Sequence, residues 1–275
     1  MAAIAGLSAV LLAVSLIDDV RPLPALLRLL VHAGGAIAIV LIWGEAFGLA
    51  SNRYGTSASW ILSLVGAFGA VLAIVWMTNL YNFMDGADGL AGGMSVIGFG
   101  AYAMASALSA NSGGSMGLLA VSIVGASAGF LAFNFAPAKV FMGDAGSIPL
   151  GFLAAALGIH GSLAQLWPWW FGVVVFSPFI VDASATLLRR TSQGNKPWIA
   201  HRDHYYQRLI LGGWSHRKTA LVYYCVMLAS AGSALVAIEY PNASVMSITW
   251  VITYGLLLLL AEWHLHQKKN NNIKK

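Results

Sequence analysis

The sequence has few charged residues and almost no cysteine. Charged side chains make up 9% of the 275 residues, against about a quarter in a soluble domain. The single cysteine, Cys225, excludes an internal disulfide, and its apolar surroundings predict a small core residue. This composition excludes an ordinary soluble domain.

Ionised residues are missing from two long stretches. None lies between Asp88 and Lys139 or between Asp144 and Asp182, and each gap exceeds the roughly 20 residues that cross a membrane. Hydrophobic residues make up 59% of the chain, and the mean hydropathy is +0.75. We therefore expect an all-α, polytopic bundle of membrane helices. A β-barrel is disfavoured, because its strands would alternate polar and apolar residues.

Nine apolar segments are long enough to cross a membrane. They cover residues 1–16, 24–43, 60–78, 92–110, 117–134, 147–164, 168–188, 219–237 and 245–263. We expect them to form a single integral-membrane domain, residues 1–275.

Basic residues fall on one side when the chain is threaded alternately through the membrane. Of the 15 Lys and Arg residues, only Arg53 lies in the opposite loops. The positive-inside rule then places the N-terminus outside and the C-terminus in the cytoplasm, with the polar motifs at the cytoplasmic face. At the other surface, Trp167, Trp169 and Trp170 fit an aromatic belt.

A polar stretch, NLYNFMDGADGLA, interrupts the apolar chain at residues 79–91. Its amides and carboxylates recur at every third position, as Asn79, Asn82, Asp85 and Asp88. A period of three drifts against the helical 3.6, so the four cannot share one face of a regular helix. Gly86 and Gly89 provide places where the helix can break. Ionisable groups among membrane segments indicate a functional site; a polar loop between two helices is the alternative.

Two further stretches add carboxylates. Asp18 and Asp19 follow the first span, and residues 134–147, NFAPAKVFMGDAGS, place Asp144 between glycines with Phe141 three residues before it. A carboxylate combined with phosphate oxygens is the usual way in which proteins hold Mg²⁺. A re-entrant turn that contains Asp and Gly is the alternative.

The motif HRDHYYQRL, residues 201–209, sets His201 and His204 three positions apart, on one side of a helix. Two histidines without clustered cysteines are a weak zinc signature. Beside Arg202 and Arg208 they are better explained as donors to phosphate oxygens. Contact with anionic lipid would explain the other basic residues of this loop, but not the histidine spacing.

Together these clusters indicate phosphoryl transfer to a lipid. Five carboxylates at one membrane face require a divalent cation to offset their repulsion. Phosphoryl transfer needs in-line positioning, a metal and cationic side chains. The sequence contains this inventory.

In this order, the motifs resemble those of the polyprenyl-phosphate N-acetylhexosamine-1-phosphate transferases, glycosyltransferase family 4. The resemblance covers essentially the whole chain, and the histidine motif is more similar to the O-antigen-initiating branch than to the phospho-MurNAc-pentapeptide translocases. It implies transfer of a HexNAc-1-phosphate from a UDP-sugar to undecaprenyl phosphate, with release of UMP. Mg²⁺ is the implied cofactor, with Mn²⁺ as the alternative.

The resemblance also implies a setting and partners. The enzyme would lie in the bacterial inner membrane among membrane lipids and start a lipid-linked cell-envelope glycan, such as the O-antigen of lipopolysaccharide. No nucleic acid is expected as a partner, and a homodimer is left open.

The resemblance implies roles for particular residues. Asp144 would be the metal ligand, and Asp18 and Asp19 would face the lipid phosphate, one of them as a base. Phe141 would pack against the uracil. The nucleotide pocket would be lined by Asn82, Asp85, Asp88 and Asn134. Phosphate oxygens would be held by His201, Arg202 and His204.

The chain departs from the family pattern in two places. Family members usually have two further helices before the adjacent acids, so the resemblance implies that this chain lacks them and any acceptor-site residues on them. Asp203 stands where a small polar residue is common and places a negative charge near the expected phosphates, which is tolerable if it points toward Arg208.

Three other functions are compatible with parts of the pattern. A transporter would use buried acids and histidines, but near the middle of the membrane. A prenyltransferase or a CDP-alcohol phosphotransferase would carry acids spaced as DxxxD, which these motifs lack. An inactive scaffold would result if the missing helices were essential.

Overall fold

The computed structural model describes residues 1–49, 57–109, 111, 113–196, 199, 201–239 and 243–273. Throughout these residues the regular secondary structure is helical, as the composition predicts. The helices are α1 (Ala2–Val20), α2 (Ala25–Ile42), α3 (Ser57–Phe83), α4 (Leu90–Leu108), α5 (Gly114–Asn134), α6 (Gly143–Leu163), α7 (Trp170–Val175), α8 (Ser177–Ser192), α9 (Tyr205–Leu211), α10 (His216–Ile238) and α11 (Ala243–Ile273).

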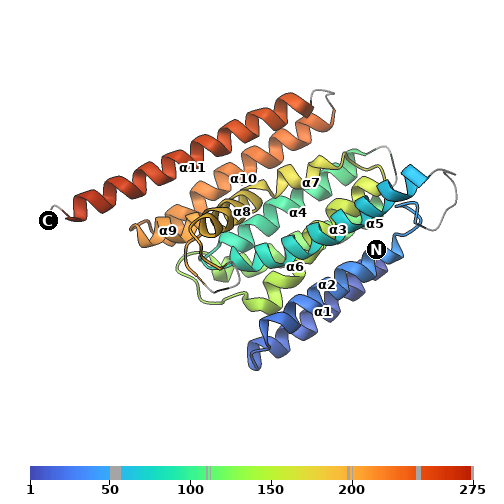
Figure 1. Ribbon diagram of the computed structural model, residues 1–275, viewed down its shortest axis with the longest axis horizontal. Helices are drawn as coiled ribbons and strands as arrows, with labels where there is room; N and C mark the ends of the chain where they lie inside the picture. Colours follow the sequence, from blue (N-terminus) through green and yellow to red (C-terminus); the bar gives the residue numbers. More distant parts are fainter. Residues whose placement is uncertain are drawn as a thin grey trace.

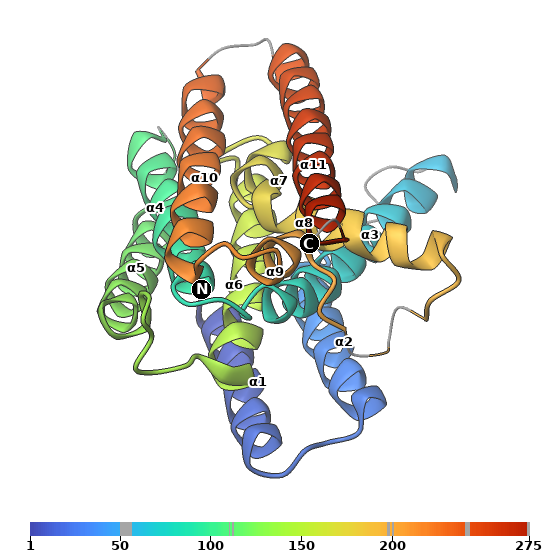
Figure 2. The ribbon, with the colours of Figure 1, turned by 90° about the vertical axis from the view of Figure 1, so that its left-hand side faces the viewer.

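Among the described residues, eight helices are long and apolar enough to cross a membrane. The polytopic helical bundle is therefore confirmed. The predicted span at 168–188 is divided into α7 and α8. The division falls at Phe176, just before Pro178 in the first turn of α8, because proline cannot donate a helical hydrogen bond. Figure 1 shows α8 nearly end-on while the long helices run side by side, and Figure 2 shows it turning across them.

The two ends of the bundle are distinct. The α1–α2 turn and α9 lie toward the end that holds the C-terminus, and the N-terminus lies toward the other (Figure 1). This arrangement is consistent with the alternate threading of the chain predicted from the sequence, in which the basic loops and the C-terminus lie on one side and the N-terminus on the other. Arg53, which that prediction put in the opposite loops, lies outside the described residues.

Helices α4 and α6 form the interior. Of their membrane-spanning windows 67% and 56% are buried, against 22% for α1. Gly151 on α6 lets the α3 backbone approach closely, since a Cβ there would lie 2.6 Å from the Met77 carbonyl oxygen and 2.8 Å from Thr78 Cα. Small residues commonly permit such contacts between membrane helices. The contact brings the end of α3 beside the start of α6.

Two expectations about single residues are wrong. Trp167 is 4% exposed and belongs to the core, where its ring stacks on Tyr102 with centroids 4.9 Å apart and its Nε1 donates to the Gly158 carbonyl. Cys225 is exposed rather than in the core. It lies on α10, whose apolar residues are not confined to one face, so its neighbours in sequence do not show which side is buried.

Two helix ends lie beside the polar motifs. The end of α1 differs from the prediction, and the break between α3 and α4 agrees with it. Helix α1 continues through Asp18 and Asp19, so that the turn begins only at Arg21. The break predicted near Gly86 and Gly89 is confirmed, because α3 ends at Phe83 and α4 begins after Gly89, whose φ is +77°. Asp85 and Asp88 both lie in this break.

Replacing Gly151 by alanine should force α3 and α6 apart. We expect a loss of about 1–3 kcal/mol in stability, seen as a lower melting temperature in detergent. The matched control is Gly125→Ala on α5, where an added Cβ meets nothing within 4 Å. Alanine favours helix over glycine, so the control should melt at the wild-type temperature or above. Equal melting of the two variants would contradict the packing.

Candidate active site

One arginine on α2 joins two of the predicted carboxylates. Nη1 of Arg28 donates to Asp18 Oδ2 at 3.1 Å and to Asp144 Oδ2 at 3.2 Å. Asp18 is 8% exposed, and its Oδ1 accepts the Leu23 backbone N–H at 2.6 Å. Arg28 therefore links α1, α2 and α6 at one point and offsets the charge of a buried carboxylate.

Asp19 lies at the start of α6. Its two oxygens accept the backbone N–H groups of Asp144 at 3.2 Å and of Ala145 at 3.1 Å. The first N–H groups of a helix lack partners within it, and negative charge is favoured there. A Cβ at Gly143 would lie 2.9 Å from Asp19 Oδ2, so glycine permits the close approach. Asp19 thus fixes the turn that carries Asp144.

Asn82 brings the end of α3 to the same place. Its amide donates to Asp144 Oδ1 at 2.6 Å and to Ser147 Oγ at 3.0 Å. With Arg28 on Oδ2, both oxygens of Asp144 have a partner. We call this set the acidic cluster; its members are Asp18, Asp19, Arg28, Asn82 and Asp144.

Asp85 lies near the acidic cluster, in the α3–α4 loop. Burial and the charge of Asp144 raise the pKa of its carboxyl from 3.8 to about 7. The acidic cluster and Asp85 together hold four carboxylates and one arginine, so acidic groups outnumber basic groups there. A site of this kind gains from a bound cation.

Asp88, in the α3–α4 loop, holds the loop between α5 and α6. Its Oδ2 accepts the Ala138 backbone N–H at 3.1 Å. Its Oδ1 lies 3.1 Å from Nδ1 of His216, the first residue of α10. Asp88 therefore connects three segments that are distant in sequence.

Asn134, buried at the end of α5, supports the same loop. It accepts the Gly89 backbone N–H at 2.9 Å and donates to the Val140 carbonyl at 2.8 Å. Phe141, which follows Val140 in this loop, is 77% exposed. Asn134 thus supports the base of the α5–α6 loop, on which the ring of Phe141 is exposed.

The histidine motif packs against the end of α3. His204 is 2% exposed, and its ring stacks on Phe83 with centroids 5.8 Å apart. The His201 ring lies 4.9 Å from that of His204. The Tyr206 hydroxyl donates to the Phe83 carbonyl at 2.9 Å. The start of α9 therefore lies next to the loop that carries Asp85.

Burial, together with the neighbouring His204 and Arg190, lowers the pKa of the His201 imidazole from its usual value of 6.5. Its Nδ1 accepts the Asp203 backbone N–H at 3.3 Å, which leaves the proton of the neutral ring on Nε2. Arg202 is exposed and is in no ion pair with the residues that the structure describes.

Asp203 does not pair with Arg208, so the condition stated for its negative charge is not met. Its carboxylate pairs with Arg190 of α8. Arg208 instead pairs with Glu262 of α11, at 2.8 Å through Nη2, and Glu262 also accepts from Arg189 at 3.0 Å. The sequence does not show which helices flank α9, so the pairing of Asp203 with Arg190 could not be read from it.

Four residues that hold the segments of the site together were not predicted from the sequence: Arg28, His216, Glu262 and Asp182, which accepts the Tyr205 backbone N–H at 2.8 Å. Three of them could have been found from the sequence, because Arg28, Asp182 and Glu262 are charged residues inside predicted apolar spans. Such residues usually face the bundle interior and pair with one another. His216 follows a polar loop and could not have been found in this way.

The acidic cluster fits a divalent cation that takes few protein ligands. Among the described residues, no group of three or more His, Cys, Asp or Glu side chains is placed to hold a metal. Mg²⁺ usually binds one or two carboxylates and completes its shell with water and phosphate oxygens. Asp144, half-buried, and the neighbouring Asp85 offer such a set of oxygens.

The fold and site define a multi-pass membrane protein with an anionic, oxygen-rich site at one end of its helix bundle. A family model described as "Glycosyl transferase family 4" matches residues 1–162. The chain belongs to this family, as its motifs indicate.

Three relatives show the range of the family. The chain is 32% identical to the probable undecaprenyl-phosphate N-acetylglucosaminyl 1-phosphate transferase of Bacillus subtilis, over 82% of this chain and 63% of the relative. It is 30% identical to the decaprenyl-phosphate N-acetylglucosaminephosphotransferase of Mycobacterium tuberculosis, over 94% and 70%. It is 35% identical to a Geobacillus phospho-N-acetylmuramoyl-pentapeptide-transferase, over 62% and 52%. The chain therefore spans only part of the length of these relatives.

Replacing Asp85 by asparagine should stabilise the protein in a pH-dependent manner. The pKa of Asp85 is about 7 in the folded protein and 3.8 ordinarily, so the cost of ionising it grows as the pH rises from about 4 to about 7 and is constant above. Without divalent cations, Asp85→Asn should raise the stability by on the order of a few kcal/mol at about pH 8 and by little near pH 4. Melting curves with a chelator present measure this.

Two comparisons make the result specific. Added Mg²⁺ should narrow the difference between Asp85→Asn and wild type, because the cation offsets the same charge. Glu239→Gln, an exposed acid at the far end of α10, should show no such pH dependence. A constant difference across the pH range would contradict the account of Asp85.

Proposed function

We propose that this protein transfers a HexNAc-1-phosphate from a UDP-sugar to undecaprenyl phosphate and releases UMP. The observation that carries the proposal is the acidic cluster beside Asp85, at one end of a multi-pass bundle, in a glycosyl transferase family 4 chain. A site at the end of a membrane bundle is accessible both to a lipid phosphate and to a soluble nucleotide sugar.

The proposed reaction forms one P–O bond and breaks another. An oxygen of the lipid phosphate attacks the phosphorus that carries the sugar. The bond from this phosphorus to the bridging oxygen breaks, and that oxygen leaves with the electron pair as part of UMP. A phosphate monoester with a second pKa near 6 is mostly dianionic at neutral pH. A base at Asp18 or Asp19 therefore contributes less than alignment and charge neutralisation.

We assign the acidic cluster to the reacting phosphates. The Arg28 side chain is 40% exposed and so offers a cation to the acceptor phosphate while Asp18 orients it. Asp144, with Asp85 beside it, would hold Mg²⁺, for which Mn²⁺ is the alternative; the ion would neutralise charge on the diphosphate oxygens. Asp19 would act through the start of α6, by holding Asp144 in place.

The remaining residues are assigned to the donor. The exposed ring of Phe141 would stack on the uracil. Asp88 and Asn134 would shape the nucleotide pocket by supporting the loop that carries Phe141. Donors to the diphosphate oxygens would come from His201 through Nε2–H and from the exposed Arg202.

The favoured donor is UDP-N-acetylglucosamine. The two relatives whose names specify N-acetylglucosamine match 82% and 94% of this chain, whereas the N-acetylmuramoyl-pentapeptide relative matches 62%. The product would be a lipid-linked diphosphate sugar that starts a cell-envelope glycan, with the O-antigen of lipopolysaccharide as one such glycan.

The proposed location is the cytoplasmic face of the bacterial inner membrane. The α5–α6 loop, the α8–α9 loop and α9, which surround the site, carry Lys139, Lys196, Arg202 and Arg208. Basic residues concentrate in cytoplasmic loops of membrane proteins. UDP-sugars would then reach the site from the cytoplasm.

Incubating the purified protein in detergent with undecaprenyl phosphate, Mg²⁺ and a panel of UDP-N-acetylhexosamines tests the proposal. We expect UMP release that depends on both substrates and is fastest with UDP-N-acetylglucosamine. Asp144→Asn should lower the rate by about 100-fold or more, because it removes the charge that would hold the metal. Its melting temperature should remain near that of wild type, since asparagine keeps an acceptor for Arg28.

The matched control is Glu239→Gln, the same kind of change at an exposed position just after α10, which should keep the wild-type rate. Near-normal turnover by Asp144→Asn would contradict its assignment. Absence of UMP release from the wild-type protein with every donor would contradict the proposed function.

A further inference from the structure

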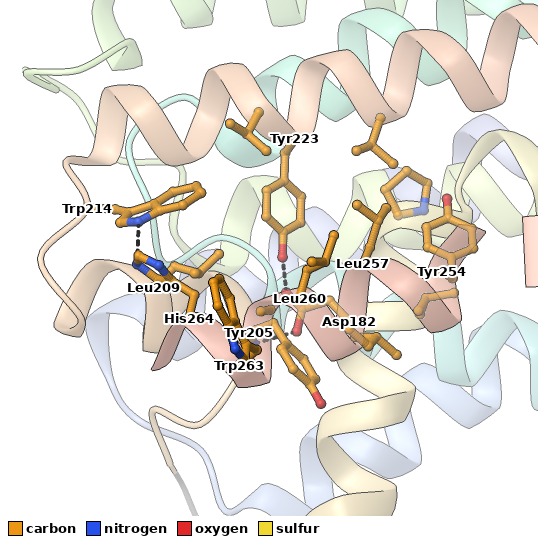
Figure 3. Close-up of a pocket in the computed structure, with 16 residues that line it drawn as sticks. Asp182, Tyr205, Leu209, Trp214, Tyr223, Tyr254, Leu257, Leu260, Trp263 and His264 are labelled. Carbon is orange, nitrogen blue, oxygen red and sulfur yellow. Dashed lines mark hydrogen bonds between the residues drawn. The ribbon is translucent and has the colours of Figure 1, made fainter. Parts of the chain in front are cut away.

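A buried carboxylate on α8 lies where three helices meet. Asp182 is 3% exposed. It lines a cavity of about 310 Å³ bounded by α8, α9, α10 and α11, in which most lining residues are apolar. Figure 3 shows Asp182 beside Tyr205 and Tyr223 among leucines and tryptophans. A charge in such surroundings is costly unless it is fully hydrogen-bonded.

Four donors converge on the Asp182 carboxylate. The backbone N–H groups of Tyr205 and Tyr206, the first two residues of α9, donate at 2.8 Å and 3.0 Å. The Tyr223 hydroxyl of α10 donates to Oδ2, and Thr186 Oγ1 donates to Oδ1 at 3.3 Å. Each carboxylate oxygen thus receives one backbone N–H and one hydroxyl. Asp182 holds the start of α9 against α8 and α10.

The position of the first turn of α9 determines where the histidine motif lies. His204 immediately precedes this turn, and its Nδ1 is 3.7 Å from Asp182 Oδ1. Tyr206 reaches from the same turn to the Phe83 carbonyl. There is no room for a side chain at Gly86, because a Cβ there would overlap the Tyr206 hydroxyl. A shift of this turn would therefore move both histidines and disturb the loop that carries Asp85.

Stability alone does not account for a carboxylate at this place. A buried charge with its partners contributes little more to stability than apolar residues of the same volume, whereas it defines one geometry. Two oxygens with two amide partners set both the position and the direction of the first turn of α9. The apolar lining of the cavity would otherwise permit several placements.

We propose that Asp182 is a positioning residue, which holds the first turn of α9 so that His201 faces the diphosphate of the donor. The inference rests on the proposed function and names a residue that acts through others. A displacement of about 1 Å in groups that align a substrate costs up to about 100-fold in rate.

Asp182→Asn tests the proposal, because asparagine has one acceptor oxygen where aspartate has two. We expect kcat for UMP release to fall about 10-fold to 100-fold, while KM for the UDP-sugar stays within about threefold because the uracil end is unchanged. Hydrogen exchange should become faster in residues 201–211 and stay unchanged in α3 and α6. Tyr223→Phe, which keeps the carboxylate and removes one hydroxyl, should show the same changes to a smaller degree. Glu239→Gln should show neither.

The outcomes separate this inference from the proposed function. Wild-type kcat and wild-type exchange in Asp182→Asn would overturn the inference. Faster exchange throughout the protein, with kcat per folded molecule unchanged, would show a merely structural role and also overturn it. If wild type releases no UMP, the proposed function fails; the exchange of residues 201–211 then decides, supporting the inference if it is selectively faster and overturning it if it is not.

Discussion

The arrangement of the site depends on one arginine that is shared between two carboxylates. Arg28 joins Asp18 on α1 to Asp144 on α6, and charged groups among membrane helices are costly without such partners. The three helices are therefore held in one relative position. Asn82 then fixes the end of α3 against Asp144, and Asp19 fixes the turn that begins α6. The acids come together through tertiary contacts, although they lie more than 100 residues apart.

The α3–α4 loop connects the parts of the site. Asp85 is affected by the charge of Asp144, and Asp88 supports the loop that carries Phe141. Gly86 lies against Tyr206 of α9. The acidic cluster, the loop that carries Phe141 and the histidine motif thus meet around the α3–α4 loop, residues 84–89. The absence of a side chain at Gly86 and the positive φ of Gly89 permit this.

The sequence predicted the bundle, eight of its nine proposed spans and the break after α3, because apolar length and glycine act locally. It placed no charge partner correctly. Arg28, Asp182 and Glu262 lie inside apolar spans, and their partners come from helices whose adjacency no local pattern reveals. Arg208 was the partner considered for Asp203, yet Asp203 pairs with Arg190 of α8. Trp167 is in the core because its ring fits against Tyr102, a contact set by folding. The roles of the site residues remain predictions from the family resemblance.

A double-mutant cycle between Arg28 and Asp18 tests the central claim most directly. Melting would be measured for wild type, Arg28→Gln, Asp18→Asn and the double variant. The account predicts that Arg28→Gln is destabilising because it leaves the Asp18 charge buried and unpaired, and that adding Asp18→Asn restores part of the loss. The coupling should be about 1 kcal/mol or more. Additive effects would show that the two side chains do not depend on each other and would contradict the account.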